Sequence, residues 1–459
     1  MRQLDIPEVT EATVIQGPKS PETFTFRYKS RSRGLVEFVS PYPGDEAAEE
    51  LLCQNETSRA FQPITPNGVV KFDNNWVGCN EPCEDRHVEN YLSRDILHAT
   101  APVKGSEKAG SILQDQPETS SLKLFSMIDG HGGCATADAL ARDLHPTVVK
   151  SLQSLYGGKK PSTVDPMLTM RLFQRGDYRS FLQAYFTMEG GHKNASTKIA
   201  AAFPITSESI SNALASAYTG LDYDICTGPL RLISTKPAAT TKKSDRNAKA
   251  DVKSLVAPAT NGACALTVLV DEDRQEVYVA NTGDSRAVAG YYVPPHTASN
   301  GIHFQGGWRC EVLTEDHTAK GPKESERLRK EHPGEEDHLL CDNGRVLGDL
   351  MPARAFGEKS KGQLKFIILA TDGPKYPGGR EKGEELKGNW FYKDKNAATH
   401  LIRNAFEACK WHPEAGKEVI SAKPPIARWM RDDVTCSVIF FGDASGEVLP
   451  KAMANKGSE

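Results

Sequence analysis

The sequence predicts an α+β fold in which two packed, mostly antiparallel β-sheets are flanked by helices (an αββα sandwich). Several short apolar runs are bounded by turn residues, which is typical of buried strands, and two of them flank a hairpin signal. Segments with helical periodicity are set among these strands and do not alternate strictly with them, which disfavours a doubly wound parallel sheet. No strand is followed by the glycine pattern and acidic partner that a dinucleotide requires, so the Rossmann fold is excluded.

The first predicted strand, 122–128 (LKLFSMI), is a short apolar run with a turn directly after it at 129–133 (DGHGG). A helix is predicted over 135–155, where apolar residues recur at helical spacing. Pro146 lies within this helix, and we expect it to kink the helix or to start a new turn.

The remaining strands lie in the second half of the chain. Segments 264–270 and 276–280 flank the charged residues DEDRQ, which predicts a hairpin. Two more buried strands are predicted at 366–371 (FIILAT) and 435–441 (TCSVIFF).

We expect one catalytic domain over 61–443, preceded by a poorly defined N-terminal extension at 1–60. An insertion is predicted at about 157–210 and a polar linker at 234–258, where apolar residues are scarce. The last residues, 444–459, are expected to form a flexible tail.

Composition restricts the class of protein. The 459 residues are 38% hydrophobic and 25% charged, which fits a soluble globular protein of one large domain or two to three ordinary ones. A net charge of −4 disfavours a nucleic-acid partner of the ordinary basic-patch kind. The ten cysteines are irregularly spaced, which disfavours a zinc site or disulfide framework and indicates a reducing compartment.

No apolar run approaches the roughly 20 residues that a transmembrane helix needs, so no transmembrane segment is expected. The first residues contain Asp5, Glu8 and Glu11, and they resemble neither a secretory signal nor an Arg-rich transit peptide. Either no leader is cleaved or the natural start lies upstream.

Acidic residues adjoin the predicted strands in several places. Asp129 and Asp372 each follow a strand, Asp432 and Asp433 precede another, and Glu84-Asp85 lies in an earlier segment. Carboxylates brought together by separate strands repel one another, and a divalent cation relieves that repulsion. Oxygen ligands without histidine or cysteine indicate a hard ion such as Mg²⁺ or Mn²⁺. A lone Asp-Gly pair is usually only a turn signal, so spacing alone leaves both interpretations open.

Five segments occur in the order of the metal-dependent type 2C protein serine/threonine phosphatase family, which the chain resembles over roughly 69–442. They are DGHGG (129–133), ANTGDSRAV (280–288), LTEDHT (313–318), ATDG (370–373) and RDDVT (431–435). Each is weak alone, but five in order are specific. The resemblance implies a pair of β-sheets flanked by helices.

Within that family the chain most resembles the pyruvate dehydrogenase phosphatases and their fungal mitochondrial relatives. The segments that carry this likeness are NEPCEDR (80–86), YTGLDYDI (218–225), LMPARAFGE (350–358) and NAATHLIRNA (396–405). Most members carry an arginine where Asn80 stands, and this branch carries asparagine there too. The resemblance assigns Asn80 to the substrate phosphate.

The resemblance further implies a cofactor of two Mg²⁺ or Mn²⁺ ions. Their ligands would be Glu84, Asp85, Asp129, the carbonyl of Gly130, Asp372 and Asp432. Asp129 would bridge the ions, and Glu84 and Asp85 would act directly or through water, because adjacent side chains of a regular strand face opposite sides. His131 would be the catalytic general acid beside Asp129. Asp284, Arg286 and His317 are interpreted as structural, and the helix around 396–405 as core packing.

Three features depart from the family pattern. Pro374 follows the second Asp-Gly, where an aliphatic residue is usual, and it restricts the turn that presents Asp372. Only 359–364 separate AFGE from the next strand, where the family has a longer passage with another strand. No aspartate stands near 259–260, so no third ion is expected there.

The predicted function is hydrolysis of phosphoserine and phosphothreonine in a phosphoprotein substrate by a metal-activated water. The branch resemblance implies the pyruvate dehydrogenase alpha subunit as the substrate and a mitochondrial location, with a cytoplasmic location as the alternative. Two other functions stay open: a catalytically impaired relative that binds or regulates phosphoproteins, and a dinuclear hydrolase of nucleotides or small phosphoesters. A regulatory partner is left unassigned.

Overall fold

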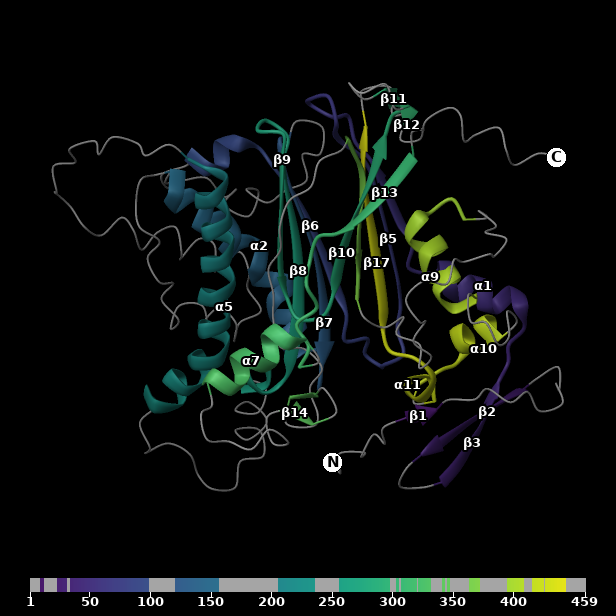
Figure 1. Ribbon diagram of the computed structural model, residues 1–459. Helices are drawn as coiled ribbons and strands as arrows, with labels where there is room; N and C mark the ends of the chain where they lie inside the picture. The colour runs from purple at the N-terminus through teal and green to yellow at the C-terminus, as the bar shows by residue number, and fades with distance from the viewer. Residues whose placement is uncertain are drawn as a thin grey trace, which may run out of the picture. The chain divides into compact units, whose positions relative to one another are not determined.

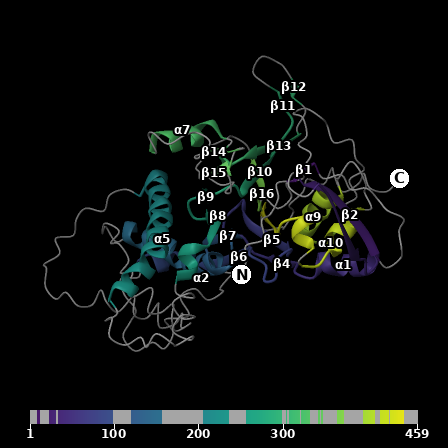
Figure 2. The same cartoon turned by 90° about the horizontal axis from the view of Figure 1, so that it is seen from below.

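Figures 1 and 2 show a computed structural model of the protein. It describes residues 9–11, 23–30, 34–98, 120–156, 205–235, 256–297, 303–304, 307–319, 321–331, 341–342, 345–346, 363–371, 394–407, 415–424 and 426–442. The chain divides into two compact units: unit 1 takes the described parts of 1–60, 71–85 and 366–440, and unit 2 takes the rest. Glu84, Asp85 and Asp432 fall in unit 1, and Asp129, Gly130 and His131 fall in unit 2.

Unit 1 contains two antiparallel groups of strands. Strands β1 (Val9–Glu11), β2 (Thr23–Ser30) and β3 (Gly34–Pro41) form a three-stranded sheet. The other strands follow the order β16 (Gln363–Ala370), β17 (Val434–Gly442), β5 (Gly68–Val77), β4 (Thr57–Ala60). β16 and β17 pair antiparallel, with Ala370 opposite Cys436. This pairing aligns the two strands that Asp372 and Asp432 adjoin in the sequence.

Four helices complete the described part of unit 1: α1 (Asp45–Cys53), α9 (Ala397–Glu407), α10 (Ala415–Ser421) and α11 (Ala427–Met430). In Figure 1, α1, α9 and α10 lie side by side. Asn396 caps α9 by accepting a hydrogen bond from the Thr399 amide at 3.0 Å. Ile402 and Phe406 of α9 pack with Val438 of β17 in one core cluster, which confirms the predicted core role of this helix.

Unit 2 is built on a four-stranded antiparallel sheet. Its order is β6 (Arg86–Leu92), β7 (Leu122–His131), β8 (Gly262–Asp271), β9 (Glu276–Thr282). A short 3-10 helix (Arg94–His98) follows β6. Strand β10 (Arg286–Val293) pairs antiparallel with β13 (Gly307–Val312). Two shorter strand pairs are β11 (His296–Thr297) with β12 (His303–Phe304) and β14 (Cys341–Asp342) with β15 (Arg345–Val346). Helix α7 (Pro322–Glu331) also belongs to this unit.

Helices α2 (Ala135–Tyr156) and α5 (Ser207–Thr235) pack on one face of this sheet, as Figure 2 shows. Leu124 of β7 and Leu269 of β8 share their core cluster with Leu144 of α2 and Leu214 of α5. α2 continues through Pro146, so this proline neither ends the helix nor starts a new one. Such burial of apolar surface, worth about 25 cal/mol per Å², fixes the sheet against the helices.

A buried ion pair joins the start of β7 to Glu272, the residue that follows β8. Lys123 and Glu272 have fully buried side chains, and their Nζ and Oε1 atoms lie 2.6 Å apart. Glu272 also accepts hydrogen bonds from the amides of Val69 (2.9 Å) and Ile64 (3.1 Å). Both charges are therefore compensated inside the unit, as burial requires.

The structure confirms the α+β class, with antiparallel sheets and helices in both units. It corrects one boundary: β7 continues through Asp129 and Gly130 to His131, so the turn begins only at Gly132. Residues of the expected extension 1–60 form β1 to β4 and α1. No helix among the described residues is both long enough and apolar enough to span a membrane.

Several predicted features lie outside the described residues. They are Asp372, Pro374, the insertion up to 204, most of the polar linker and the tail from 444. Of the short passage 359–364, Gln363 and Leu364 belong to β16, and the rest lies outside as well.

Candidate active site

In unit 1, Asp433 organises the loop that carries Asn80 and Glu84. The buried Asp433 carboxylate accepts hydrogen bonds from the backbone amides of Cys79, Asn80 (3.0 Å) and Glu84 (2.8 Å), and from Asn80 Nδ2 (2.8 Å). Burial alone would raise its pKa, but these hydrogen bonds hold the pKa of Asp433 below its ordinary value. Asp433 is therefore an ionised structural anchor, a role that sequence reasoning missed.

Arg431 completes this anchor from the other side of the motif. Its buried guanidinium donates to the carbonyls of Gly78 (2.8 Å), Val77 (3.1 Å) and Val419 (3.1 Å). Segment 431–433 is thus bonded to the end of β5 through Arg431 and to the loop at 79–84 through Asp433. The charged residues on either side of Asp432 were the sequence signal for this anchor, since charged groups that become buried need partners.

Asp432 lies between these two anchors and remains half-exposed. Its side chain is 47% exposed and forms an ion pair with Arg428, one helical turn earlier. Cys79 Sγ lies 3.9 Å from Asp432 Oδ1. Asp432 is therefore accessible beside the loop that Asp433 holds.

Asp85 is buried, and one of its carboxylate oxygens accepts a hydrogen bond from Thr435 Oγ1 at 2.7 Å. Thr435 also bonds to the end of β16, because its amide donates to Thr371 Oγ1 at 2.9 Å. Thr371 directly precedes Asp372 in the chain. Thr435, which sequence reasoning did not single out, thus links Asp85 to the segment that carries another predicted ligand.

Glu84 and Asp85 lie between β5 and β6, outside any strand, so strand alternation does not force them to opposite sides. Glu84 is half-buried, and its Oε2 lies 3.4 Å from Asn80 Nδ2. The Asn80 amide therefore donates to two carboxylates of this loop, those of Asp433 and Glu84. Unit 1 brings together Asn80, Glu84, Asp85 and Asp432, all of them predicted site residues.

In unit 2, Asp129, Gly130 and His131 occupy the last three positions of β7. Asp129 pairs with Cys264 across the ladder and His131 pairs with Gly262, so both predicted catalytic side chains lie on the same face. Both are half-buried, whereas Gly130 is buried. Burial, and then the charges of Asp129 and Asp284, raise the pKa of the Cys264 thiol. This thiol is therefore protonated and poorly suited to bind a metal.

The turn after β7 is held by the residues that precede β8. Gly132 and Gly133 have φ angles of 72° and 124°, which favour glycine. Asn261 Nδ2 donates to the Gly132 carbonyl. Sequence reasoning did not identify Asn261 or Gly262, because their relation to the turn depends on strand register.

Residues interpreted as structural make contacts of that kind. His317 Nδ1 accepts from the Gly283 amide at 3.1 Å, and the His317 amide donates to the Gly283 carbonyl at 3.0 Å. Asp284 is buried beside Cys264, whose Sγ lies 3.5 Å from its Oδ1. Arg286 forms an ion pair with Asp316.

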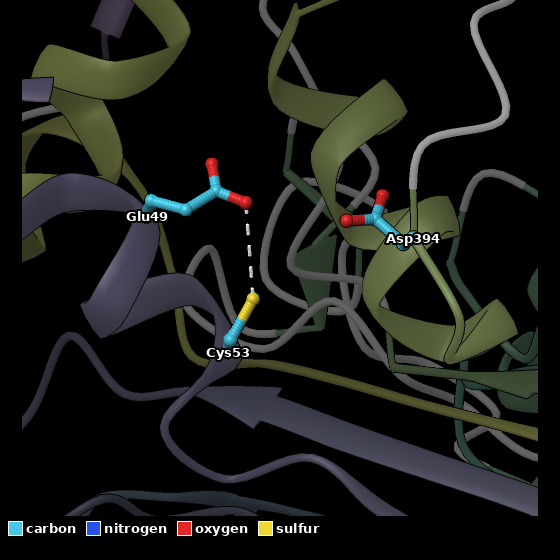
Figure 3. Close-up of side chains that lie close together, drawn as sticks. All are labelled: Glu49, Cys53 and Asp394. Carbon is cyan, nitrogen blue, oxygen red and sulfur yellow. Dashed lines mark hydrogen bonds between the residues drawn. The ribbon is translucent and has the colours of Figure 1, made fainter. Parts of the chain in front are cut away.

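A second acidic group in unit 1 has metal-ligand spacing. The potential ligand atoms of Glu49, Cys53 and Asp394 lie within 4.8 Å of one another, and Figure 3 shows Glu49 beside Cys53. Arg403, however, donates to Glu49 Oε2 at 2.7 Å and to Asp394 Oδ2 at 2.9 Å. Burial, followed by the charges of Glu56 and Glu49, raises the pKa of Cys53. This group is therefore an ion network in which the guanidinium of Arg403 already provides the positive charge that a metal ion would provide.

The donor chemistry of the predicted residues fits a hard divalent ion. Glu84, Asp85 and Asp432 offer carboxylate oxygens in unit 1, and Asp129 offers one in unit 2, next to a backbone carbonyl. Such ligands suit Mg²⁺ or Mn²⁺. Asp433 and Arg431 bond the segment at 431–433 to the end of β5 and to the loop that carries Glu84.

Comparison with known proteins gives consistent matches. The sequence model of the family described as Protein phosphatase 2C matches residues 164–369. A protein phosphatase 2C homologue of Schizosaccharomyces pombe is 25% identical, and the match covers 91% of this chain and 89% of that protein. The mitochondrial pyruvate dehydrogenase [acetyl-transferring]-phosphatase 1 of Saccharomyces cerevisiae is also 25% identical, with 91% and 80% covered.

Among solved structures, a serine-threonine phosphatase 2C from Toxoplasma gondii matches with a TM-score of 0.35 and 15% identity. The match covers 84% of this chain and 99% of that one.

Proposed function

We propose that the chain is a protein serine/threonine phosphatase of the protein phosphatase 2C family, and that its activity depends on Mg²⁺ or Mn²⁺ held by the predicted carboxylates. One observation carries this proposal. Asp433 bonds the loop at 79–84 to the segment before β17, and Thr435 donates to Asp85, so that three carboxylates from two distant parts of the chain belong to one hydrogen-bonded assembly. These are Glu84, Asp85 and Asp432.

The proposed ligands are Glu84, Asp85 and Asp432 of unit 1, Asp129 and the Gly130 carbonyl of unit 2, and Asp372. When bound, two such ions lower the pKa of a coordinated water and neutralise charge on the phosphoryl oxygens. Asp433 would keep the unit 1 ligands in place, because the loop depends on its four hydrogen bonds.

His131 is proposed as the general acid, whose imidazole would protonate the leaving serine or threonine oxygen. Its place on the same face as Asp129, two residues away, supports this role. Asn80 is proposed to contact the substrate phosphate. It would exchange its longer hydrogen bond, 3.4 Å to Glu84, for one to a phosphoryl oxygen.

The substrate that we propose is the phosphorylated alpha subunit of pyruvate dehydrogenase, with a mitochondrial location. The similarity to a mitochondrial pyruvate dehydrogenase phosphatase supports both points. A kinetic comparison tests the substrate: the value of kcat/KM should be higher for a phosphopeptide from that subunit than for unrelated phosphoserine peptides. Equal values would contradict this part of the proposal.

Asp129→Asn tests the metal-dependent activity itself. Loss of a direct ligand should lower the Mn²⁺-dependent rate on a phosphoserine peptide by about 100-fold or more, because even outer-shell partners contribute about 10–100-fold. Asp95→Asn is the matched control, since Asp95 is exposed and lies outside the proposed ligand set. Equal Mn²⁺-dependent rates for Asp129→Asn and the parent would contradict the role of Asp129 as a ligand. A parent rate no higher than that of buffer alone would remove the catalytic proposal in favour of a non-catalytic binding protein.

A further inference from the structure

The last pair of the β7–β8 ladder joins His131 to Gly262. In this antiparallel pair the two residues lie directly opposite each other, where side chains normally make contact across the strands. Gly262 has no side chain to offer, so the space above its Cα is available to the partner. In this pair, therefore, only His131 has a side chain, and that side chain can occupy the space over Gly262.

The His131 imidazole fills that space. A Cβ placed on Gly262 would lie 2.6 Å from Cε1 and 2.8 Å from Cδ2 of His131, and closer still to Nε2. All three of the nearest atoms belong to the imidazole ring. The φ of Gly262 lies outside the left-handed region, so the backbone itself does not require glycine here. The structure thus uses glycine at position 262 to make room for a side chain.

The preceding residue fixes the other side of the turn. Asn261 donates its amide hydrogen to the Gly132 carbonyl, and a Cβ on Gly133 would lie 2.9 Å from Asn261 Oδ1 and 3.0 Å from Nδ2. The Asn261 side chain therefore lies directly against the turn that follows His131. The backbone of Asn261 is held as well, because its backbone N–H donates to the Ala257 carbonyl at 3.0 Å.

We infer that Asn261 and Gly262 are positioning residues for His131: Gly262 provides the space in which the imidazole lies, and Asn261 fixes the turn that follows it. This inference rests on the proposed role of His131 as the general acid. A misplaced imidazole cannot protonate the leaving oxygen, and general acid catalysis of this kind contributes about 10²–10⁴-fold.

Gly262→Ala separates positioning from folding. The atoms that the new methyl group meets are the end of a half-buried side chain, so the ring should move and the backbone should stay. On a phosphoserine peptide, whose alkoxide leaving group needs a proton, kcat should fall by about 100-fold. On p-nitrophenyl phosphate, whose leaving group needs none, it should fall by less than about 10-fold. A merely structural defect would lower both rates alike.

The matched control is Gly307→Ala, because Gly307 also lies in a strand and a Cβ there would meet nothing within 4 Å. Asn261→Asp, which keeps the shape and removes the donor, should show the same selective loss on the phosphopeptide. The double variant His131→Ala/Gly262→Ala should be no slower than His131→Ala alone, since one interaction accounts for both losses.

Thermal unfolding of the metal-free protein tests the contact between position 262 and the His131 imidazole independently of catalysis. Gly262→Ala should lower the unfolding temperature in the parent and lower it by less than half as much in the His131→Ala background. Multiplicative rate losses, or an undiminished drop in unfolding temperature in that background, would overturn the inference. If the parent protein had no phosphopeptide activity but the drop in unfolding temperature still depended on His131, the proposed function would be overturned. The inference that Gly262 makes room for His131 would then still hold.

Discussion

At the scale of single residues, Asp432 and Asp433 show how two adjacent carboxylates take opposite roles. Asp433 is 3% exposed and accepts four hydrogen bonds from the loop at 79–84. Asp432 is half-exposed and pairs with Arg428 at the surface. One of the two therefore serves the fold, and the other is available for a ligand.

The two aspartates should therefore differ in their effect on stability. Asp433→Asn should lower the free energy of unfolding by about 2–3 kcal/mol, because the new amide group faces donors that the charged carboxylate now satisfies. Asp432→Asn should lower it by less than about 1 kcal/mol, since exposed ion pairs contribute little. Urea unfolding without metal measures both. A larger loss for Asp432→Asn would contradict the assignment of the structural anchor.

At the scale of elements, a chain of buried hydrogen bonds joins the sheet of unit 2 to its helices. His145 of α2 lies between Asn90 Oδ1 (2.6 Å) and Ser126 Oγ (2.7 Å). Ser126 bonds to Thr267 at 2.6 Å, and Tyr218 of α5 donates to Thr267 at 2.6 Å. Burial lowers the pKa of His145 to about 3, so the imidazole is neutral in the folded protein.

This depressed pKa predicts a loss of stability at mildly acidic pH. The unfolded chain protonates His145 near pH 6.5 and the folded chain does not until about pH 3, so the unfolded state binds more protons between these values. Stability is then highest above pH 6.5 and falls as the pH drops. His145 should account for a loss of about 2 kcal/mol between pH 7.5 and pH 5.

Urea unfolding at both pH values checks this prediction. His145→Gln should be less stable at pH 7.5 and should lose about 2 kcal/mol less than the parent on acidification. His98→Gln, at an exposed histidine of the same unit, is the matched control and should keep the dependence of the parent. An unchanged dependence in His145→Gln would show that this histidine is not the responsible group.

At the scale of the whole molecule, the proposed ligands come from both units. An ion that binds only the folded protein raises its stability by mass action, by about 2.7 kcal/mol at 100 times the dissociation constant. If both units contribute ligands to one centre, that gain depends on carboxylates of each. Global unfolding therefore reports whether the two sets act together.

Mn²⁺ should raise the unfolding temperature of the parent protein in a concentration-dependent way. Asp129→Asn in unit 2 and Asp432→Asn in unit 1 should each remove most of this increase, whereas Asp95→Asn should retain it. Scanning calorimetry with and without Mn²⁺ measures the effect. Full retention of the increase in either ligand variant would contradict a shared centre.

The sequence by itself determined several of the strands, two of the helices and the acidic residues that adjoin them. Apolar runs marked β7, β8, β16 and β17, and helical spacing marked α2 and α9, because these signals depend on neighbours along the chain. The order of residues along the chain also placed acidic residues next to several of the predicted strands. The α+β class followed from the same observations.

Only the tertiary structure decided which acidic residue anchors the loop, why position 262 is glycine, and how far β7 extends. Asp433, Gly262 and His145 each act through residues that lie far away in the sequence: Cys79, His131 and Asn90. Hydrogen bonding and steric exclusion depend on what lies opposite an atom in space. That partner is set by strand register and helix packing, which no local pattern specifies.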